Sequence, residues 1–185
     1  MTQEENLTIR RILKVNHAGE CGAVNIYRAQ IFVCRLFHPA LLPFLTETLS
    51  HELVHRDRFR AAMPARKARP CGAMPLWGVG GYALGFATAV LGANAVMICT
   101  AAVERTVHIH LQDQMHFLKD RDTDLHALIA SIETEELGHL THAQSHMKAS
   151  ALSAPLDRLI TLATETVIFL STQGDVARMA RALRR

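Results

Sequence analysis

Residues 136–139 read Glu-Leu-Gly-His and residues 52–55 read Glu-Leu-Val-His, so the pattern Glu-x-x-His occurs twice. A single glutamate, Glu20, lies 32 residues before Glu52, and Glu104 lies 32 residues before Glu136. On a helix, positions i and i+3 lie on one face, so the Glu and His of each motif can reach the same point. Each half of the chain therefore supplies one single Glu and one Glu-x-x-His pair.

The repeated spacing has a geometric cause. A helix of about 20 residues followed by a short loop places the facing positions of a helical hairpin roughly this far apart. Four helices that supply Glu, Glu-x-x-His, Glu and Glu-x-x-His form the ligand set of ferritin-like di-iron carboxylate bundles. We therefore predict an all-α, ferritin-like four-helix bundle. Its predicted metal ligands are Glu20, Glu52, His55, Glu104, Glu136 and His139.

The other histidines and glutamates near the motifs are weaker candidates, because both residue types are common on exposed helix faces. Two histidines close to the proposed ligands, His17 and His110, are candidates to orient them through hydrogen bonds. Six other histidines have no counterpart in the other half, and we expect them to be solvated or hydrogen-bonded: His51, His108, His116, His126, His142 and His146. Glu47, Glu133 and Glu135 are expected to be exposed helix charges.

Length and composition favour a single helical domain that spans residues 1–185. Apolar residues make up 49% of the chain and aromatic residues 5%, and alternation typical of strands is scarce. The four cysteines form no Cys-x-x-Cys pair and are interpreted as reduced thiols. A net charge of +3 gives no support for a nucleic-acid partner. The polar, acidic N-terminus predicts neither a signal nor a transit peptide, which favours a bacterial cytoplasm.

Five long helices are expected from the apolar periodicity and from the positions of proline. The expected ranges are 7–36, 41–63, from 95 onward, 122–148 and 156–170. The last of these is apolar, and a basic tail follows it, so residues 156–185 form an apolar helix and tail. For this helix, core packing and membrane contact are equally compatible with the pattern.

Residues 71–103 contain no charged side chain over 33 positions. This segment has three interpretations: a membrane span, an ordinary buried helix, or a helix that lies against a bilayer and helps form an apolar substrate pocket. A span is hard to combine with Glu104, which follows directly and must lie in the bundle core. We therefore favour the third interpretation, with a turn near residues 92–94. In this interpretation, the wall of the substrate channel would include Trp77, Tyr82, Leu84 and Phe86.

Basic residues gather beside the apolar segments. Six Arg or Lys residues fall within residues 56–69 against a single acid, Asp57, and a second cluster lies at Arg178, Arg181, Arg184 and Arg185. Either cluster is a solvated face or a contact with anionic lipid.

The ligand types predict the metal and its chemistry. Carboxylates and neutral imidazole suit iron or manganese, and iron is favoured for oxygen chemistry. Glu52 and Glu136 would bridge two metal ions, and four carboxylates would balance the charge of two divalent ions. Two iron(II) ions would reduce O₂, one oxygen atom would be placed on a substrate held nearby, and the second would leave as water.

Five stretches, at residues 16–20, 52–57, 74–85, 102–108 and 135–139, resemble the demethoxyubiquinone hydroxylases of ubiquinone biosynthesis. The resemblance covers residues 7–172. It implies the same six iron ligands and hydroxylation of a polyprenyl methoxybenzoquinol, from demethoxyubiquinol to demethylubiquinol. It also implies O₂ as co-substrate, with NADH and the quinol itself as candidate electron donors.

The resemblance further implies a peripheral enzyme on the cytoplasmic face of the bacterial cytoplasmic membrane. An apolar face of this size should meet lipid, another copy of the chain, or a lipid-binding accessory protein of the ubiquinone pathway. We expect a homodimer or a larger homo-oligomer.

The chain departs from the family pattern at three places, none of which removes a ligand. Cys21 stands where the family usually has Tyr after the first ligand. Residues 110–111 read His-Leu where some members have His-Tyr, and residues 174–185 have no counterpart.

Three rival functions share parts of this pattern. An iron store or peroxide-scavenging protein would share the ligands but not need the apolar segment. A di-iron tRNA hydroxylase would call for a basic groove with aromatic residues. A helical membrane-associated binding protein without catalysis would leave the mirrored spacing unexplained.

Overall fold

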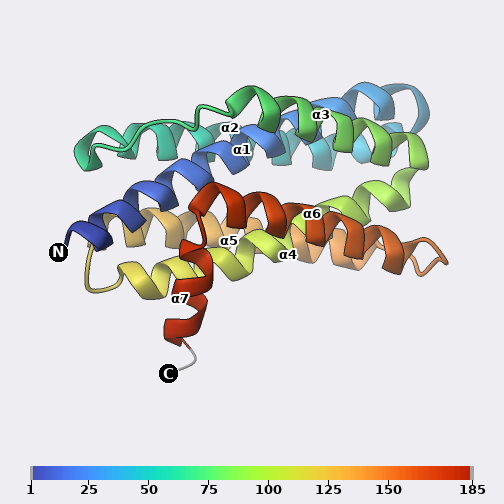
Figure 1. Ribbon diagram of the computed structural model, residues 1–185. Coiled ribbons are helices and arrows are strands. Elements are labelled where there is room, and N and C mark those ends of the chain that lie inside the picture. Colours follow the sequence, from blue (N-terminus) through green and yellow to red (C-terminus); the bar gives the residue numbers. More distant parts are fainter. Residues whose placement is uncertain (1, 184–185) are drawn as a thin grey trace.

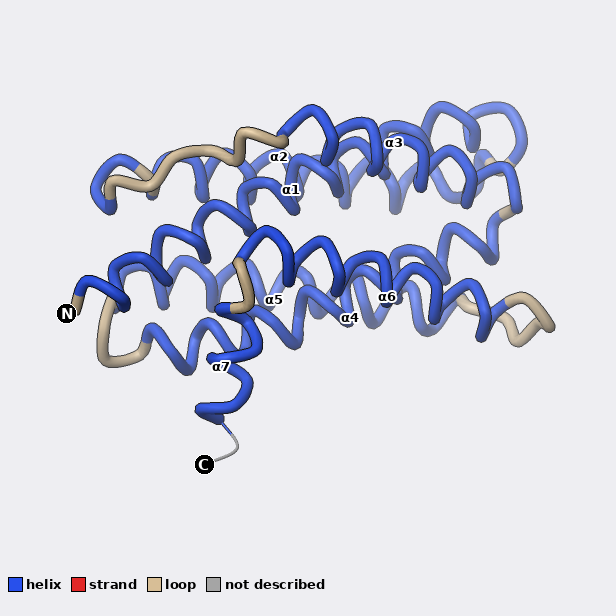
Figure 2. The backbone as a smooth tube through the Cα atoms, in the orientation of Figure 1, coloured by secondary structure: helices blue, strands red, loops and turns tan. Residues whose placement is uncertain are grey.

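The computed structural model describes residues 2–183, and its regular structure in this range is helical throughout (Figures 1 and 2). The elements are α1 (Gln3–Phe37), a 3-10 turn (Pro39–Leu41), α2 (Leu42–Ala62), a 3-10 turn (Pro64–Arg66), α3 (Met74–Leu91), α4 (Ala93–Leu118), α5 (Thr123–His146), α6 (Ser153–Thr172) and α7 (Asp175–Leu183). The all-α prediction is confirmed.

Local sequence signals explain where several helices begin and end. Thr2 and Glu5 form a capping box, so α1 begins one turn before the predicted start. The side chain of Asp122 accepts a hydrogen bond from the backbone N–H of Leu125 and caps α5. Gly92 has a φ of 113°, in the region that favours glycine, and it separates α3 from α4. The turn predicted near residues 92–94 is therefore confirmed.

Helices α1, α2, α4 and α5 form the four-helix bundle. One apolar cluster fills one end of it and includes Ile12, Phe59, Leu118 and Ile129. A second cluster fills the other end and includes Tyr27, Leu45, Met97 and Leu140. The proposed metal ligands occupy positions between these two clusters along all four helices, which is the arrangement of a ferritin-like bundle.

Helix α3 packs along α1, and α6 packs along α4 (Figure 1). Glycines permit the close crossing of α3 and α1, because Gly81 lies against the backbone of Gly22 and Gly85 against the backbone of Ile26. Many of the other side chains of α3 are exposed, among them Leu76, Val79 and Val90. Within the described residues, Met74–Leu91 is the one helix long and apolar enough to cross a membrane, and 22% of it is buried. The interpretation as an ordinary buried helix is therefore wrong for residues 74–91, whereas residues 95–102 of the same segment are buried in α4.

The predicted basic tail contains a docked helix, α7. Val176 and Met179 are buried in the same apolar cluster as Ile12. Asp175 is buried and its carboxylate accepts a hydrogen bond from Arg11 at 2.9 Å, and it also pairs with Arg178. Arg184 and Arg185, predicted as part of the basic cluster, lie outside the described residues.

Candidate metal centre

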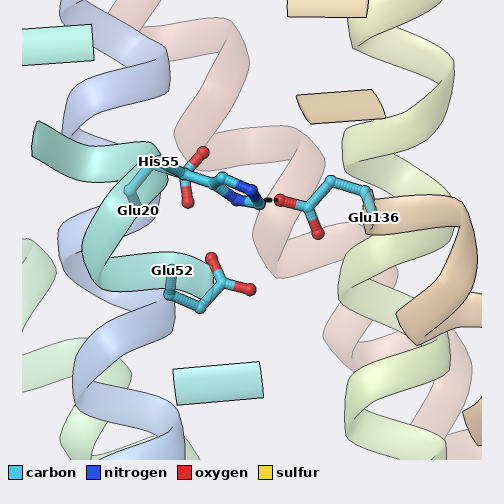
Figure 3. A group of neighbouring side chains, drawn as sticks. All are labelled: Glu20, Glu52, His55 and Glu136. Carbon is cyan, nitrogen blue, oxygen red and sulfur yellow. Dashed lines mark hydrogen bonds and ion pairs between the residues drawn. The ribbon is translucent and has the colours of Figure 1, made fainter. Parts of the chain in front are cut away.

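The six predicted ligand side chains are all buried, and they form two adjoining groups. The first group is Glu20, Glu52, His55 and Glu136, and the second is Glu52, Glu104, Glu136 and His139. Within each group the potential ligand atoms lie within 4.8 Å of one another. Figure 3 shows the first group, with Glu136 facing the other three side chains across the bundle. Glu52 and Glu136 belong to both groups, which suits them to bridge two metal ions.

Both imidazole rings turn Nδ1 toward the centre of the cluster. His55 Nδ1 lies 3.1 Å from Glu136 Oε1, and His139 Nδ1 lies 3.2 Å from Glu136 Oε2. The same His139 nitrogen lies 3.6 Å from Glu52 Oε1. Each His follows its motif glutamate by three residues, so the helix itself brings both side chains to one face. The Nδ1 atoms are therefore placed to bind metal.

Both Nε2 atoms face outward to partners that the sequence did not single out. His55 Nε2 lies 3.2 Å from Glu135 Oε2, and His139 Nε2 lies 3.0 Å from His51 Nδ1. The hydrogen-bonded role expected for His51 is confirmed. Glu135 was expected to be an exposed helix charge; its side chain is 41% exposed, but its carboxylate also contacts a ligand ring, which was not predicted. The missed signal is that residues 51 and 135 each directly precede a motif glutamate.

The four buried carboxylates lie close together, and burial and mutual repulsion oppose their ionisation. Burial, together with the charge of Glu136, raises the pKa of Glu20 to about 7. Burial and the neighbouring carboxylates raise the pKa of Glu52 and of Glu104 well above the usual range. Burial opposes ionisation of Glu136 too, but hydrogen bonds from His139 and His55 lower its pKa to about 2. Among residues 2–183, Glu52 Oε1 has no hydrogen-bond partner. Two divalent ions would balance the charge of the four carboxylates, so these residues fit a two-metal site.

The raised carboxyl pKa values predict a pH dependence of the metal-free protein. A carboxyl group whose folded-state pKa is raised contributes stability that is complete below its unfolded value, here 4.5, and that is lost as the pH rises through the folded value. Glu20 therefore destabilises the metal-free fold between pH 4.5 and about 7. Urea unfolding should give a lower free energy at pH 8 than at pH 5. The fall should be smaller in a Glu20→Gln variant, and an equal fall in both proteins would contradict this assignment.

Tyr27 is a further residue of the site that sequence reasoning missed. Its hydroxyl donates a hydrogen bond to Glu104 Oε1 at 2.6 Å, and burial raises its pKa, which keeps it a donor. The available signal is its position, two helical turns after Glu20 on α1, which places both on one face. Tyr27 therefore fixes the orientation of Glu104.

An apolar cavity of about 540 Å³ leads to the carboxylates. Glu20, Glu52, Glu104 and Glu136 are among its lining residues, and its walls come from α1, α3, α4 and α6. The cluster is therefore open to an apolar molecule between α3 and α6.

Two of the four predicted channel residues line this cavity, Trp77 and Leu84. Tyr82 and Phe86 do not, and they are 42% and 43% exposed on α3. The difference follows from the helical period, because positions 77 and 84 are two turns apart on one face whereas 82 and 86 lie on the other side. The prediction is corrected for Tyr82 and Phe86.

The two histidines proposed to orient the ligands occupy different places. His110 lines the cavity, and its Nε2 lies 3.0 Å from Glu165 Oε2 on α6. His17 is buried, and burial with the charges of Arg60 and Arg56 lowers its pKa. Within residues 2–183 neither ring is hydrogen-bonded to one of the six proposed ligands, so neither orients a ligand by direct contact.

Exposed apolar side chains cover the outer faces of the two helices that flank the cavity. On α3 they include Leu76, Val79 and Val90, and on α6 they include Leu159 and Leu162. Each is at least 62% exposed. Apolar surface of this extent on neighbouring helices indicates an interaction site.

The fold and the paired Glu and Glu-x-x-His positions define a ferritin-like carboxylate protein. Residues 7–171 match the model of the family described as ubiquinone biosynthesis protein COQ7, and the chain belongs to this family.

Curated relatives are similar over much of the chain. The NADPH-dependent 3-demethoxyubiquinone 3-hydroxylase of Dictyostelium discoideum is 34% identical, over 89% of this chain and 77% of its own. The 3-demethoxyubiquinol 3-hydroxylase of Rhodospirillum rubrum is 42% identical, over 71% of this chain and 61% of its own. The 5-demethoxyubiquinone hydroxylase of Saccharomyces cerevisiae is 32% identical, over 74% of this chain and 65% of its own.

Proposed function

We propose that the chain is a single-domain di-iron monooxygenase that hydroxylates the ring of a polyprenyl methoxybenzoquinol, converting demethoxyubiquinol to demethylubiquinol in ubiquinone biosynthesis. The observation that carries this proposal is that the apolar cavity reaches the buried Glu and His cluster. A quinol ring with a prenyl tail is apolar and matches such a space, whereas iron storage does not require it. The names of the curated relatives support the substrate class.

The six ligand residues would divide between two iron ions. Glu52 and Glu136 belong to both ligand groups and would help to hold both ions, Glu20 and His55 would hold one ion, and Glu104 and His139 would hold the other. When bound, two iron(II) ions supply the electrons and the Lewis acidity that O₂ activation requires. Tyr27 holds Glu104 in place through its 2.6 Å hydrogen bond, which fixes the geometry before substrate arrives.

The cavity residues position the ring and exclude water. Trp77 and Leu84 supply apolar wall beside the carboxylates. His110 Nε2–H donates to Glu165, so its buried Nδ1, which has no hydrogen-bond partner among the described residues, is left as an acceptor. We propose that this nitrogen accepts a hydrogen bond from a ring hydroxyl of the quinol and so orients the ring toward the cluster.

The outer faces of α3 and α6 support a peripheral membrane enzyme. A prenyl tail partitions into lipid, and exposed side chains such as Leu76 and Leu162 flank the cavity through which it would enter. We propose a location on the cytoplasmic face of a bacterial cytoplasmic membrane. The same faces support self-association as a homo-oligomer and contact with a lipid-binding accessory protein of the pathway.

The deciding experiment uses protein purified without oxygen in mild detergent and loaded with iron(II). We expect about two irons per chain and, with a short-tailed demethoxyubiquinol, a product heavier by one oxygen atom from ¹⁸O₂. NADH, NADPH and the quinol alone are compared as electron donors. Iron that oxidises while the quinol stays unchanged would favour an iron store or peroxide scavenger. Failure to bind metal would contradict the assignment of the cluster.

A further inference from the structure

The two proposed ligand histidines have chemically different outer partners. The residue before each motif glutamate contacts the imidazole of the opposite motif: His51 on α2 contacts His139 on α5, and Glu135 on α5 contacts His55 on α2. Residues 51 and 135 are equivalent because each directly precedes the glutamate of a Glu-x-x-His motif. Residue 51 has an imidazole side chain, whereas residue 135 has a carboxylate. The near twofold symmetry of the ligand set is therefore broken directly outside it.

The direction of each ring settles which atom carries a proton when metal is bound. Because Nδ1 of His55 and of His139 faces the carboxylate cluster, Nδ1 is the nitrogen that would bind metal. Nε2 must then carry the hydrogen and donate it outward. Nε2–H of His55 donates to Glu135 Oε2 at 3.2 Å, and Nε2–H of His139 donates to His51 Nδ1 at 3.0 Å.

The two acceptors act differently on the rings that donate to them. A carboxylate draws the proton away from imidazole and makes the metal-binding nitrogen a stronger donor, and such partners also fix ring orientation. The ring of His51 carries no negative charge when it accepts at Nδ1. It also stacks on His139, with ring centroids 5.2 Å apart and planes 15° apart, so it fixes the orientation of that ring by packing.

We infer that Glu135 and His51 are positioning residues that make the two metal positions unequal, the position served by His55 and Glu135 being the tighter one. This inference rests on the proposed two-metal site. Loss of an outer partner of a ligand histidine typically lowers metal affinity 10- to 100-fold. We therefore expect the dissociation constants of the two metal positions to differ by about tenfold or more.

The test is a titration of metal-free protein with Co²⁺ without oxygen, followed by the visible absorption of the bound ion. The readout is independent of catalysis. Wild-type protein should bind two Co²⁺ ions in separated steps. Glu135→Gln should weaken the first step about 10- to 100-fold and bring the two steps together. His51→Glu supplies the missing carboxylate and should tighten the second step.

A Glu47→Gln variant is the matched control, because it removes an exposed carboxylate from the same helix as His51, one turn away. It should leave both steps unchanged. The inference would be overturned if two Co²⁺ ions bound to wild-type protein in one unresolved step, or if Glu135→Gln left both dissociation constants unchanged. Either result would still support the two-metal site. Absence of any bound Co²⁺ would instead defeat the proposed function.

Discussion

A Glu136→Ala variant is expected to keep its helices and to lose metal binding and hydroxylation together. The two oxygen atoms of Glu136 face both ligand histidines, at 3.1 Å from His55 Nδ1 and 3.2 Å from His139 Nδ1. The side chain also belongs to both ligand groups. Because even an outer partner of a ligand contributes about 10- to 100-fold, removal of a shared ligand should lower turnover by more than about 100-fold.

The matched control for this variant is Glu133→Ala, the same change three residues earlier on α5. Glu133 lies 3.1 Å from His108 and belongs to neither ligand group. Iron content, turnover and the far-ultraviolet circular dichroism spectrum are measured for both variants. We expect two irons and near wild-type turnover from Glu133→Ala. A Glu136→Ala protein that still binds two irons and hydroxylates quinol would show that the cluster is not the site of reaction.

The residues of the cluster were predictable because the spacing of two residues along a helix determines whether their side chains lie on the same face. The pairs Glu52/His55 and Glu136/His139 are separated by three residues, so each pair shares a face whatever the rest of the chain does. The equal spacing to Glu20 and Glu104 reflects two hairpins of equal length. Gly92 was also predictable as a break, since a turn had to return Glu104 to the bundle.

The residues that were missed depend on contacts between helices, which spacing does not specify. Glu135 was interpreted as an exposed charge because nothing in α5 alone shows that α2 brings His55 to it. Tyr27 meets Glu104 only once α1 and α4 are packed. Tyr82 and Phe86 were assigned to the cavity because the uniformly apolar sequence of α3 does not reveal which face turns inward. Residue spacing within a helix therefore predicts the ligands, but it does not predict which residues of neighbouring helices contact them.

The crossing of α3 and α1 should be the most sensitive point outside the metal site, and Gly85→Ala should disrupt it. A Cβ atom at residue 85 would overlap the backbone carbonyl of Ile26 and come within 2.8 Å of its Cα. Backbone atoms of a helix do not move aside easily, so α3 must shift. Overpacking of this kind costs about 1–3 kcal/mol, which corresponds to a fall in Tm of roughly 2–12 °C for a chain of this length.

Displacement of α3 should also impair substrate binding, because Trp77 and Leu84 on the same helix line the cavity. We expect KM for the quinol to rise in Gly85→Ala while the iron content stays at the wild-type value, since α3 carries none of the proposed ligands. Gly80→Ala is the control on the same helix: a Cβ there meets nothing within 4 Å. Alanine favours helix over glycine by about 1 kcal/mol, so Gly80→Ala should be at least as stable as wild type. Equal thermal stability of the two variants would mean that α3 does not depend on glycine contact with α1. A lower Tm in Gly85→Ala alone, with a raised KM for the quinol and the wild-type iron content, would show that close packing of α3 on α1 holds the wall of the substrate cavity in place.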